Sequence, residues 1–306
     1  MSNPRFGAIE AGGTKFICAV GSSPDDLGEP VRIPTTSPAE TIANVIALFR
    51  ENVRTHGALD GIGIASFGPA GVHLGRSDWG TILSTPKPGW SNTHLARPFG
   101  DEFGIPVGFD TDVNGAALAE YRWGAAVNAG VATYVTIGTG IGAGTVVNGR
   151  AIHGMRHPEA SHFHPPRHPL DREFTGTCPF HGDCLEGLAS GPAIELRWGA
   201  SLSRLPADHV AHEVIAFYLG HFVTTLQAVL SPRRIVFGGG VLGTPGLLAR
   251  VRTAAAQLGG GYFCGTDSLD ELVVAPGLGQ RSGLLGAVLL AQMAWQKRTM
   301  QSGDRR

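Results

Sequence analysis

Two cysteines and two histidines follow one another at the spacing expected of ligands to a single metal ion. They form the pattern H-x15-C-x2-H-x2-C and are His162, Cys178, His181 and Cys184. Thiolate sulfur and imidazole nitrogen are the usual donors of tetrahedral zinc, and a site with four protein ligands is structural. The spacing therefore predicts a structural Zn²⁺, with a chance cluster as the alternative. Four further histidines of the same stretch compete as ligands: His153, His157, His164 and His168.

Glycine-rich turns lie inside two apolar, strand-like hairpins. The first turn is Glu10–Lys15, and the second is formed by residues 138–142. Glycines and a threonine in such a turn can present backbone N–H groups and a hydroxyl to phosphate. The first turn matches neither the Rossmann nor the P-loop pattern, and a tight turn requiring positive φ is the alternative. The recurrence indicates a duplicated module, whose two copies would hold a nucleotide's phosphates from both sides.

A third glycine run, Gly238-Gly239-Gly240, ends an apolar strand. Three residues without side chains leave a flat patch against which adenine or ribose can lie. A flexible turn is the alternative for this run.

Asp112 stands between a predicted strand and a predicted helix, at residues 106–109 and 113–123. A carboxylate there can accept the proton of a hydroxyl that attacks a γ-phosphoryl group. Capping of the helix is the alternative role. Asp110 and Asp112 point to opposite sides of an extended segment, and spacing alone leaves open which one faces a ligand. Glu120, two helical turns on, is either a second polar group of the site or solvated.

Glu159 and His162 are three residues apart and share a face if the segment is helical. Glu159 would then bond substrate hydroxyls, while His162 would use one ring nitrogen for the metal and the other for substrate. Purely structural ligation by His162 is the alternative.

Composition excludes several classes of protein. Of the 306 residues 42% are apolar and 16% charged, and the net charge is −1, which provides no basic surface for nucleic acid or an acidic membrane. Residues 1–20 lack the pattern of a signal peptide, and the longest apolar run, 283–291, is too short to span a bilayer. We expect a cytoplasmic protein without a Cys178–Cys184 disulfide.

Strands alternate with helices along the chain, which predicts an α/β protein. Besides the two hairpins, the pattern predicts strands at 62–65, 106–109, 234–237 and 272–274, and helices at 41–54, 113–123, 211–230 and 283–293. Residues 151–187 read as irregular, and the polar end from Lys297 as frayed. We expect two related domains around a cleft, at 1–115 and 116–306, the second carrying the nucleotide-binding glycines and a zinc-binding insertion at 153–187.

The chain resembles the ROK family of sugar kinases over nearly its whole length. The matching motifs come in the family's order: Glu10-Ala11-Gly12-Gly13-Thr14-Lys15, Asp112-Val113-Asn114, Glu159-x-x-His162, the Cys/His cluster ending Cys184-Leu185-Glu186, and Gly238-Gly239-Gly240-Val241. Other features are similar to the bacterial fructokinase branch: Ser66-Phe67-Gly68-Pro69, Thr85-Pro86-Lys87-Pro88-Gly89-Trp90, Asp110-Thr111-Asp112-Val113-Asn114, and His181 in place of a cysteine.

The resemblance implies an actin-like (ribonuclease H-like) ATPase fold, a homodimer, and transfer of the γ-phosphoryl of Mg²⁺-bound ATP to a hexose hydroxyl, usually the 6-hydroxyl. It makes Asp112 the catalytic base. The implied sugar contacts are Gly68, Thr85, Asn92, Glu159, His162 and Glu186. The implied phosphate contacts are Gly12, Gly13, Thr14, Lys15, Thr139 and Gly140. The implied nucleoside contacts are Pro192, Gly238, Gly239 and Gly240. Zinc would pin the loop that carries Glu159 and His162.

Two positions differ from glucokinase-type members of the family, which have Asn and Gly where this chain has Thr111 and Ser161. Thr111 is shared with the fructokinase branch, while the hydroxymethyl of Ser161 is expected to alter the sugar pocket. The expected function is phosphorylation of D-fructose to fructose 6-phosphate. The alternatives are a kinase of mannose or glucose, and a sugar-sensing protein without catalysis, against which the intact Asp112 and the non-basic charge argue.

Overall fold

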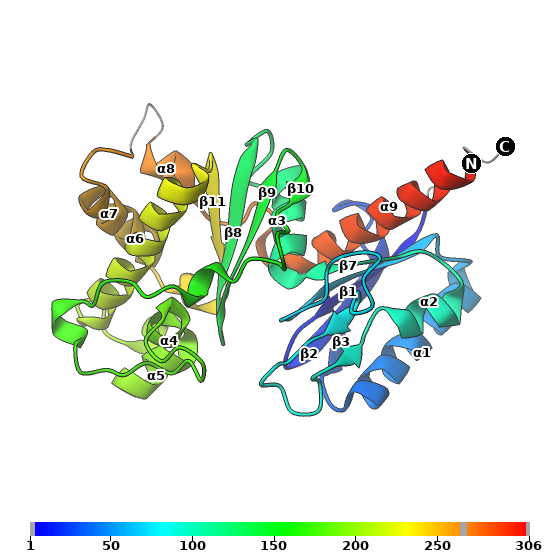
Figure 1. The fold of residues 1–306 in the computed structure, drawn as a ribbon, viewed down its shortest axis with the longest axis horizontal. Coiled ribbons are helices and arrows are strands. Elements are labelled where there is room, and N and C mark those ends of the chain that lie inside the picture. Colours follow the sequence, from blue (N-terminus) through cyan, green and yellow to red (C-terminus); the bar gives the residue numbers. More distant parts are fainter. Residues whose placement is uncertain (1–3, 264–267, 304–306) are drawn as a thin grey trace. The chain divides into compact units, whose positions relative to one another are not determined.

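The computed structural model describes residues 4–263 and 268–303, which form two compact α/β units (Figure 1). The first unit contains the described residues of Met1–Ala119, Ala151–His157 and Gln280–Arg306, and the second contains Glu120–Arg150 and Pro158–Gly279. This differs from the expected division at residue 115, because the last helix and a short central segment fold with the first unit.

The two units carry sheets of the same topology, as the repeated hairpin predicted. The first has the strand order β3 (Val31–Pro34), β2 (Lys15–Gly21), β1 (Phe6–Ala11), β4 (Gly61–Ser66) and β7 (Val107–Thr111). The second has the order β10 (Arg150–Ala151), β9 (Ile141–Val147), β8 (Val131–Ile137), β11 (Arg234–Gly238) and β12 (Val273–Val274). In each sheet the central strand, β1 or β8, pairs antiparallel with its hairpin partner and parallel with the strand on its other side.

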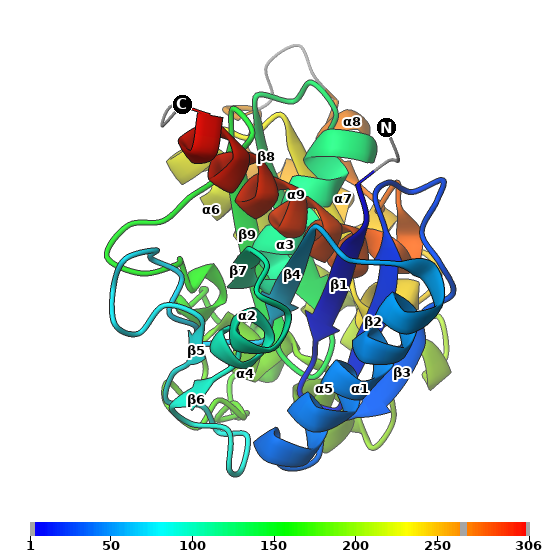
Figure 2. The ribbon, with the colours of Figure 1, turned by 90° about the vertical axis from the view of Figure 1, so that its right-hand side faces the viewer.

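Helices cover both faces of the first sheet (Figure 2). The helices of this unit are α1 (Pro38–His56), α2 (Arg97–Phe103), the first part of α3 (Asp112–Trp123), and α9 (Ser282–Gly303). Alternating residues of β1 face opposite helices, because Gly7 lies against Phe49 of α1 whereas the ring of Phe6 contacts Trp295 of α9. The polar end of α9 is helical to Gly303, contrary to the fraying predicted from Lys297, and the last three residues of that stretch, 304–306, lie outside the described residues.

Helix α9 packs against the start of α3. The two helices cross backbone to backbone at a pair of glycines, where a Cβ on Gly286 would lie 2.2 Å from the carbonyl carbon of Gly115. Such a close approach requires glycine. It fixes α3 one turn after Asp112.

The second unit packs its helices around α6, the centre of its apolar core. They are α4 (Leu185–Ala189), α5 (Gly191–Trp198), α6 (Ala211–Leu230), α7 (Leu247–Gly259) and α8 (Leu269–Leu272). Single 3₁₀ turns occur at Ala160–His162, Pro169–Asp171, Leu202–Arg204, Gly240–Gly243 and Gly279–Arg281. By length and composition α6 matches a membrane span, but half of its most apolar stretch is buried within the protein, as in a core helix.

The short hairpin of β5 (Thr81–Ile82) and β6 (Thr93–His94) extends the first unit beside β4, because an isolated bridge joins Ile82 to Ala70. The loop between its strands carries two of the predicted sugar contacts, and the fully buried Trp90 anchors it by donating its indole N–H to the carbonyl of Thr36 at 2.9 Å.

Candidate active site and metal centre

The turn between β1 and β2 leaves the N–H groups of Gly13 and Thr14 available to a ligand, while the N–H of Gly12 donates to the carbonyl of Lys15 (3.1 Å) within the turn. Its carbonyl groups are held by Thr35, whose N–H donates to Thr14 (3.0 Å) and whose hydroxyl donates to Gly12 (2.8 Å). No described residue accepts a hydrogen bond from the N–H of Gly13 or Thr14. Space is open beside Gly13, while Thr14 and Lys15 are exposed. The turn therefore has the free donors that a phosphate group requires.

The residue before Asp112 caps helix α3, so Asp112 itself does not have to. The N–H of Asn114 donates to the Thr111 hydroxyl (3.2 Å), so Thr111 caps α3. One carboxylate oxygen of Asp112 accepts the N–H of Val113 (2.9 Å), and no described residue bonds the other. The capping role considered for Asp112 therefore falls to Thr111, and Asp112 keeps an oxygen free to accept a proton.

Both carboxylate oxygens of Asp110, in contrast, contact other groups of the protein. Its Oδ1 accepts the side-chain amide of Asn114 (2.8 Å) and the N–H of Thr111 (2.7 Å), and its Oδ2 lies 2.9 Å from Nε2 of His153. This hydrogen bond raises the pKa of His153. The choice between the two aspartates, which spacing left open, thus favours Asp112 as the candidate base.

Burial modifies the ionisation of Asp112 and of its neighbour Glu10. Burial raises the pKa of Asp112 to about 6, although backbone N–H groups oppose the shift. Glu10, at the end of β1, has a pKa raised to about 7, first by burial and then by the charge of Asp112, while Lys15 opposes the rise. Its Oε2 is buried without a hydrogen-bond partner. The candidate base, the phosphate turn and Glu10 therefore share one electrostatic environment.

The sequence patterns assigned Glu10 no role, although a carboxylate directly before a glycine turn could have indicated a site residue.

For Glu120, neither of the predicted roles is correct. Its fully buried carboxylate accepts three backbone N–H groups, from Ala125 (2.7 Å), Gly277 (3.0 Å) and Leu278 (3.1 Å), so it ties two loops of the second unit together.

The predicted sugar contacts of the first unit lie on adjoining loops. The N–H of Leu83 donates to the carbonyl of Pro69 (2.8 Å), next to Gly68, and the carbonyl of Leu83 accepts the N–H of Asn92 (3.3 Å). The hydroxyl of Thr85 accepts the N–H of Lys87 (3.4 Å), which orders the same loop. The structure therefore brings these three candidates close in the fold, with Asn92 exposed and the other two partly exposed.

In the second unit, Glu186 binds the backbone of the second glycine turn. Its Oε2 accepts the N–H of Ile141 (2.9 Å), and a Cβ on Gly140 would lie 2.7 Å from the same oxygen. Ser161 is fully buried, and its hydroxyl donates to the carbonyl of Ile141. The hydroxyl of Ser161 is therefore used inside this unit, which leaves no support for the expected change to the sugar pocket.

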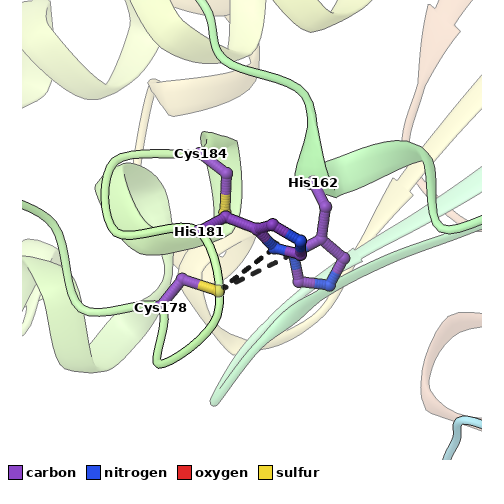
Figure 3. Close-up of side chains that lie close together, drawn as sticks. All are labelled: His162, Cys178, His181 and Cys184. Carbon is purple, nitrogen blue, oxygen red and sulfur yellow. Dashed lines mark hydrogen bonds between the residues drawn. The ribbon is translucent and has the colours of Figure 1, made fainter.

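The four predicted metal ligands converge on one point (Figure 3). Nδ1 of His162 lies 3.2 Å from Nδ1 of His181, 3.5 Å from Sγ of Cys184 and 3.8 Å from Sγ of Cys178. Tetrahedral zinc with bonds of about 2.0–2.3 Å separates its donor atoms by about 3.3–3.8 Å. The donor set and its spacing therefore fit zinc, and neither cysteine is in a disulfide.

The other nitrogen of His162 faces Glu159, with 3.9 Å between Nε2 and Oε2. The use of this second nitrogen for substrate stays a prediction. The four competing histidines lie outside the cluster and have other contacts. His153 and His157 belong to the first unit, where they contact Asp110 and Ala70 respectively. His164 lies 3.1 Å from the carbonyl of His181, and His168 accepts the N–H of Leu170.

A pocket of about 280 Å³ lies within the second unit, between the second glycine turn, the start of α5 and the glycine run. It is lined by Thr139, Pro192 and Gly240, three of the predicted nucleotide contacts. Gly238 and Gly239 are required by the protein itself, because a Cβ would lie 2.3 Å from the Tyr134 hydroxyl and 2.4 Å from the Ile137 carbonyl respectively. Only Gly240 of the run lines the pocket.

Known proteins resemble this chain over nearly its whole length. The sequence model of the ROK family matches residues 6–294. The fructokinase of Zymomonas mobilis is 48% identical over 302 residues, which is 97% of this chain and 100% of that protein. A putative fructokinase of Bacillus subtilis is 40% identical over 294 residues, with coverage of 95% and 96%. The crystal structure of a ROK hexokinase from Thermus thermophilus has a TM-score of 0.77 at 26% identity and covers 96% of this chain and 99% of that one. These similarities confirm the predicted actin-like α/β fold.

Proposed function

The chain belongs to the ROK family, and from this premise we propose that it is an ATP-dependent kinase that converts D-fructose to fructose 6-phosphate. The observation that carries the proposal is Asp112, a partly buried carboxylate with one unbonded oxygen, beside a glycine turn in which the N–H groups of Gly13 and Thr14 have no acceptor among the described residues. The fructokinase relatives and the fructokinase-type Thr111 favour fructose as the acceptor.

In the proposed reaction, Asp112 accepts the proton of the 6-hydroxyl as that oxygen attacks the γ-phosphorus of ATP. The bond from the γ-phosphorus to the bridging oxygen breaks, and ADP leaves. The N–H groups of Gly13 and Thr14, with the ammonium of Lys15, stabilise charge on the phosphate oxygens. Mg²⁺ bound to ATP neutralises part of the same charge. Most of the catalysis then comes from positioning the two reactants.

The remaining assignments follow family membership and the contacts within each unit. From family membership we assign the hexose to Gly68, Thr85, Asn92, Glu159, His162 and Glu186. We assign the nucleotide to Gly12–Lys15, Thr139, Gly140, Pro192 and the glycine run. Zinc would act structurally, because four protein ligands leave no open position for water. We further propose, from family membership, a cytoplasmic homodimer.

Acid should inactivate the enzyme with a midpoint near pH 6. Asp112 must be ionised to accept a proton, and burial raises its pKa to about 6. Hexose kcat/KM should therefore fall about tenfold per pH unit below pH 6. Stability should change in the opposite direction, because a raised carboxyl pKa means that folding disfavours the ionised form. The free energy of unfolding should decrease as pH rises from about 4 to about 7.

Glu10→Gln is the control for this assignment. Glu10 has a pKa of about 7 and is still largely protonated at pH 6, so the variant should keep the acid midpoint of the activity profile even if its rate differs. Rate profiles from pH 5 to 8 and urea unfolding over the same range provide the measurement. An acid midpoint that moves below pH 5 in Glu10→Gln would assign the titration to Glu10 rather than to Asp112.

A coupled assay of ADP release across fructose, mannose and glucose tests the function itself. Fructose should have the highest kcat/KM, by about tenfold or more, a margin that pocket contacts ordinarily provide. A preference for mannose or glucose would keep the kinase and change its substrate. ATP consumption that no hexose stimulates would reject the kinase assignment.

A further inference from the structure

Two of the histidines outside both the metal cluster and the proposed chemistry share one short segment. His153 and His157 lie on the segment Ala151–His157, which folds with the first unit although the chain before and after it belongs to the second. The segment ends two residues before Glu159, a proposed hexose contact. We call it the two-histidine segment.

His153 holds the turn from β7 to α3. Its Nε2 lies 2.9 Å from Oδ2 of Asp110, and the other oxygen of Asp110 takes the amide of Asn114 and the N–H of Thr111. The groups that face His153 are Asp110 of β7, Asn114 of α3 at 3.3 Å, and the ring of His73 at 5.8 Å between centroids. Asp112, the candidate base, therefore lies between two residues that belong to this network.

His157 holds the loop after β4. Its Nε2 accepts the N–H of Ala70 at 3.0 Å, and the residue is only 8% exposed. Its ring also lies directly behind Gly68, because a Cβ on Gly68 would be 3.6 Å from Cε1 of His157. Gly68 is another of the proposed hexose contacts.

We propose that the two-histidine segment positions the active site, His153 through the turn that presents Asp112 and His157 through the loop that presents Gly68. The inference rests on the proposed kinase function. The two rings play opposite hydrogen-bonding roles at Nε2. His153 donates to a carboxylate, whereas His157 must keep Nε2 unprotonated in order to accept from Ala70.

Loss of either ring should leave a buried group unsatisfied. Without His153, Oδ2 of Asp110 loses its hydrogen-bond donor, and the less stabilised negative charge of that carboxylate, two residues from Asp112, disfavours ionisation of the base. Without His157, the N–H of Ala70 loses its acceptor, and the Gly68 loop is free to shift. Loss of His153 acts on the base and should therefore change kcat. Loss of His157 acts on the hexose contact and should therefore change the hexose KM.

The test compares His153→Leu and His157→Leu with His153→Gln and His157→Gln. Glutamine is the matched control, because its amide reaches the position of Nε2 and can donate to Asp110 or accept from Ala70. His153→Leu should lower kcat about 10–100-fold, and His157→Leu should raise the hexose KM by a similar factor, the size expected of small misplacements. The KM for ATP should stay within about twofold of wild type, and the Gln variants should recover most of the loss.

Two further readouts separate positioning from a general structural role. The acid midpoint of His153→Leu should move to higher pH by about half a unit or more. Zinc content, measured by mass spectrometry of the metal, should remain that of wild type in all four variants. Variants with wild-type kcat, KM and acid midpoint would overturn the proposal, and a loss of zinc would reassign the histidines as ligands.

Amide hydrogen exchange tests the positioning role of the two histidines without depending on kinase activity. The Leu variants should exchange faster than wild type at 110–114 or 67–70, respectively, whether or not any hexose is phosphorylated. If wild-type enzyme phosphorylates no hexose, the proposed function fails while exchange still tests the contacts. If wild type is active and exchange at those residues is unchanged, the positioning role fails alone.

Discussion

Replacing Asp112 with Asn is expected to lower the turnover of hexose phosphorylation about 10²–10⁴-fold, the usual effect of removing a general base. The structure gives this residue one unbonded carboxylate oxygen and a pKa raised by burial to about 6, so it is ionised at neutral pH yet basic enough to accept a proton. Asparagine keeps the size of the side chain and can still accept the N–H of Val113. Substrate affinities and the melting temperature should therefore change little.

The measurement is steady-state ADP release at pH 7.5, with ADP binding followed by calorimetry. Asp101→Asn is a matched control, because Asp101 is an exposed aspartate of α2 whose contact is a surface ion pair with Arg97. That variant should retain wild-type turnover, since exposed pairs contribute little. Near-normal turnover of Asp112→Asn would reject Asp112 as the base and direct attention to Glu10, the neighbouring carboxylate.

Removing zinc is expected to have the second large effect, on folding and on hexose affinity together. Structural zinc contributes about 10–16 kcal/mol in small zinc domains, so its loss should unfold the segment between His162 and Cys184. His162 joins the cluster to Glu159, and Glu186 follows Cys184 by two residues. Hexose affinity should fall about 10–100-fold, as it does when groups that orient a site are lost. ADP affinity should fall less, because Pro192 and Gly240 line a pocket of their own.

Cys178→Ser tests this without a chelator, and His164→Ala is its control. His164 lies in the same stretch but contacts the carbonyl of His181 and Asp183 rather than the cluster. It should keep zinc and both affinities. Metal content, urea unfolding, and calorimetry with fructose and with ADP give the answer. Equal loss of both affinities in Cys178→Ser would mean that zinc only holds the second unit together, and unchanged zinc content would remove Cys178 from the ligand set.

Local patterns predicted most elements of the fold. The apolar, glycine-rich hairpins, the strand at 234–238 and the helix at 211–230 all appear at or near their expected places, because alternation and helical spacing are properties of short segments. The same dependence on local patterns explains why the helical end of α9 was predicted to be frayed. Its last turns are polar and form no apolar stripe, yet residues 294–303 continue the helix that packs on β1, β4 and β7.

The candidate site shows where such reasoning stops. Sequence alone offered both Asp110 and Asp112 as bases and eight residues as metal ligands. His153 binds Asp110, which favours Asp112 as the candidate base, and the convergence of His162, Cys178, His181 and Cys184 favours these four as the candidate ligands. The sequence indicated that Glu120 was either a site residue or a solvated one. The structure shows instead that it is buried and accepts N–H groups from loop 277–278.

The sequence by itself determined the family, the duplicated hairpin and the residue types able to perform phosphoryl transfer. Those follow from motif order and from periodicities that persist along the chain. The tertiary structure decided which oxygen stays free, which histidines join the candidate metal cluster and why Ser161 is buried. The physical reason is that a carboxylate or an imidazole can do chemistry only with the hydrogen-bonding capacity that its neighbours leave unused. Those neighbours, such as His153 beside Asp110, come from distant parts of the chain.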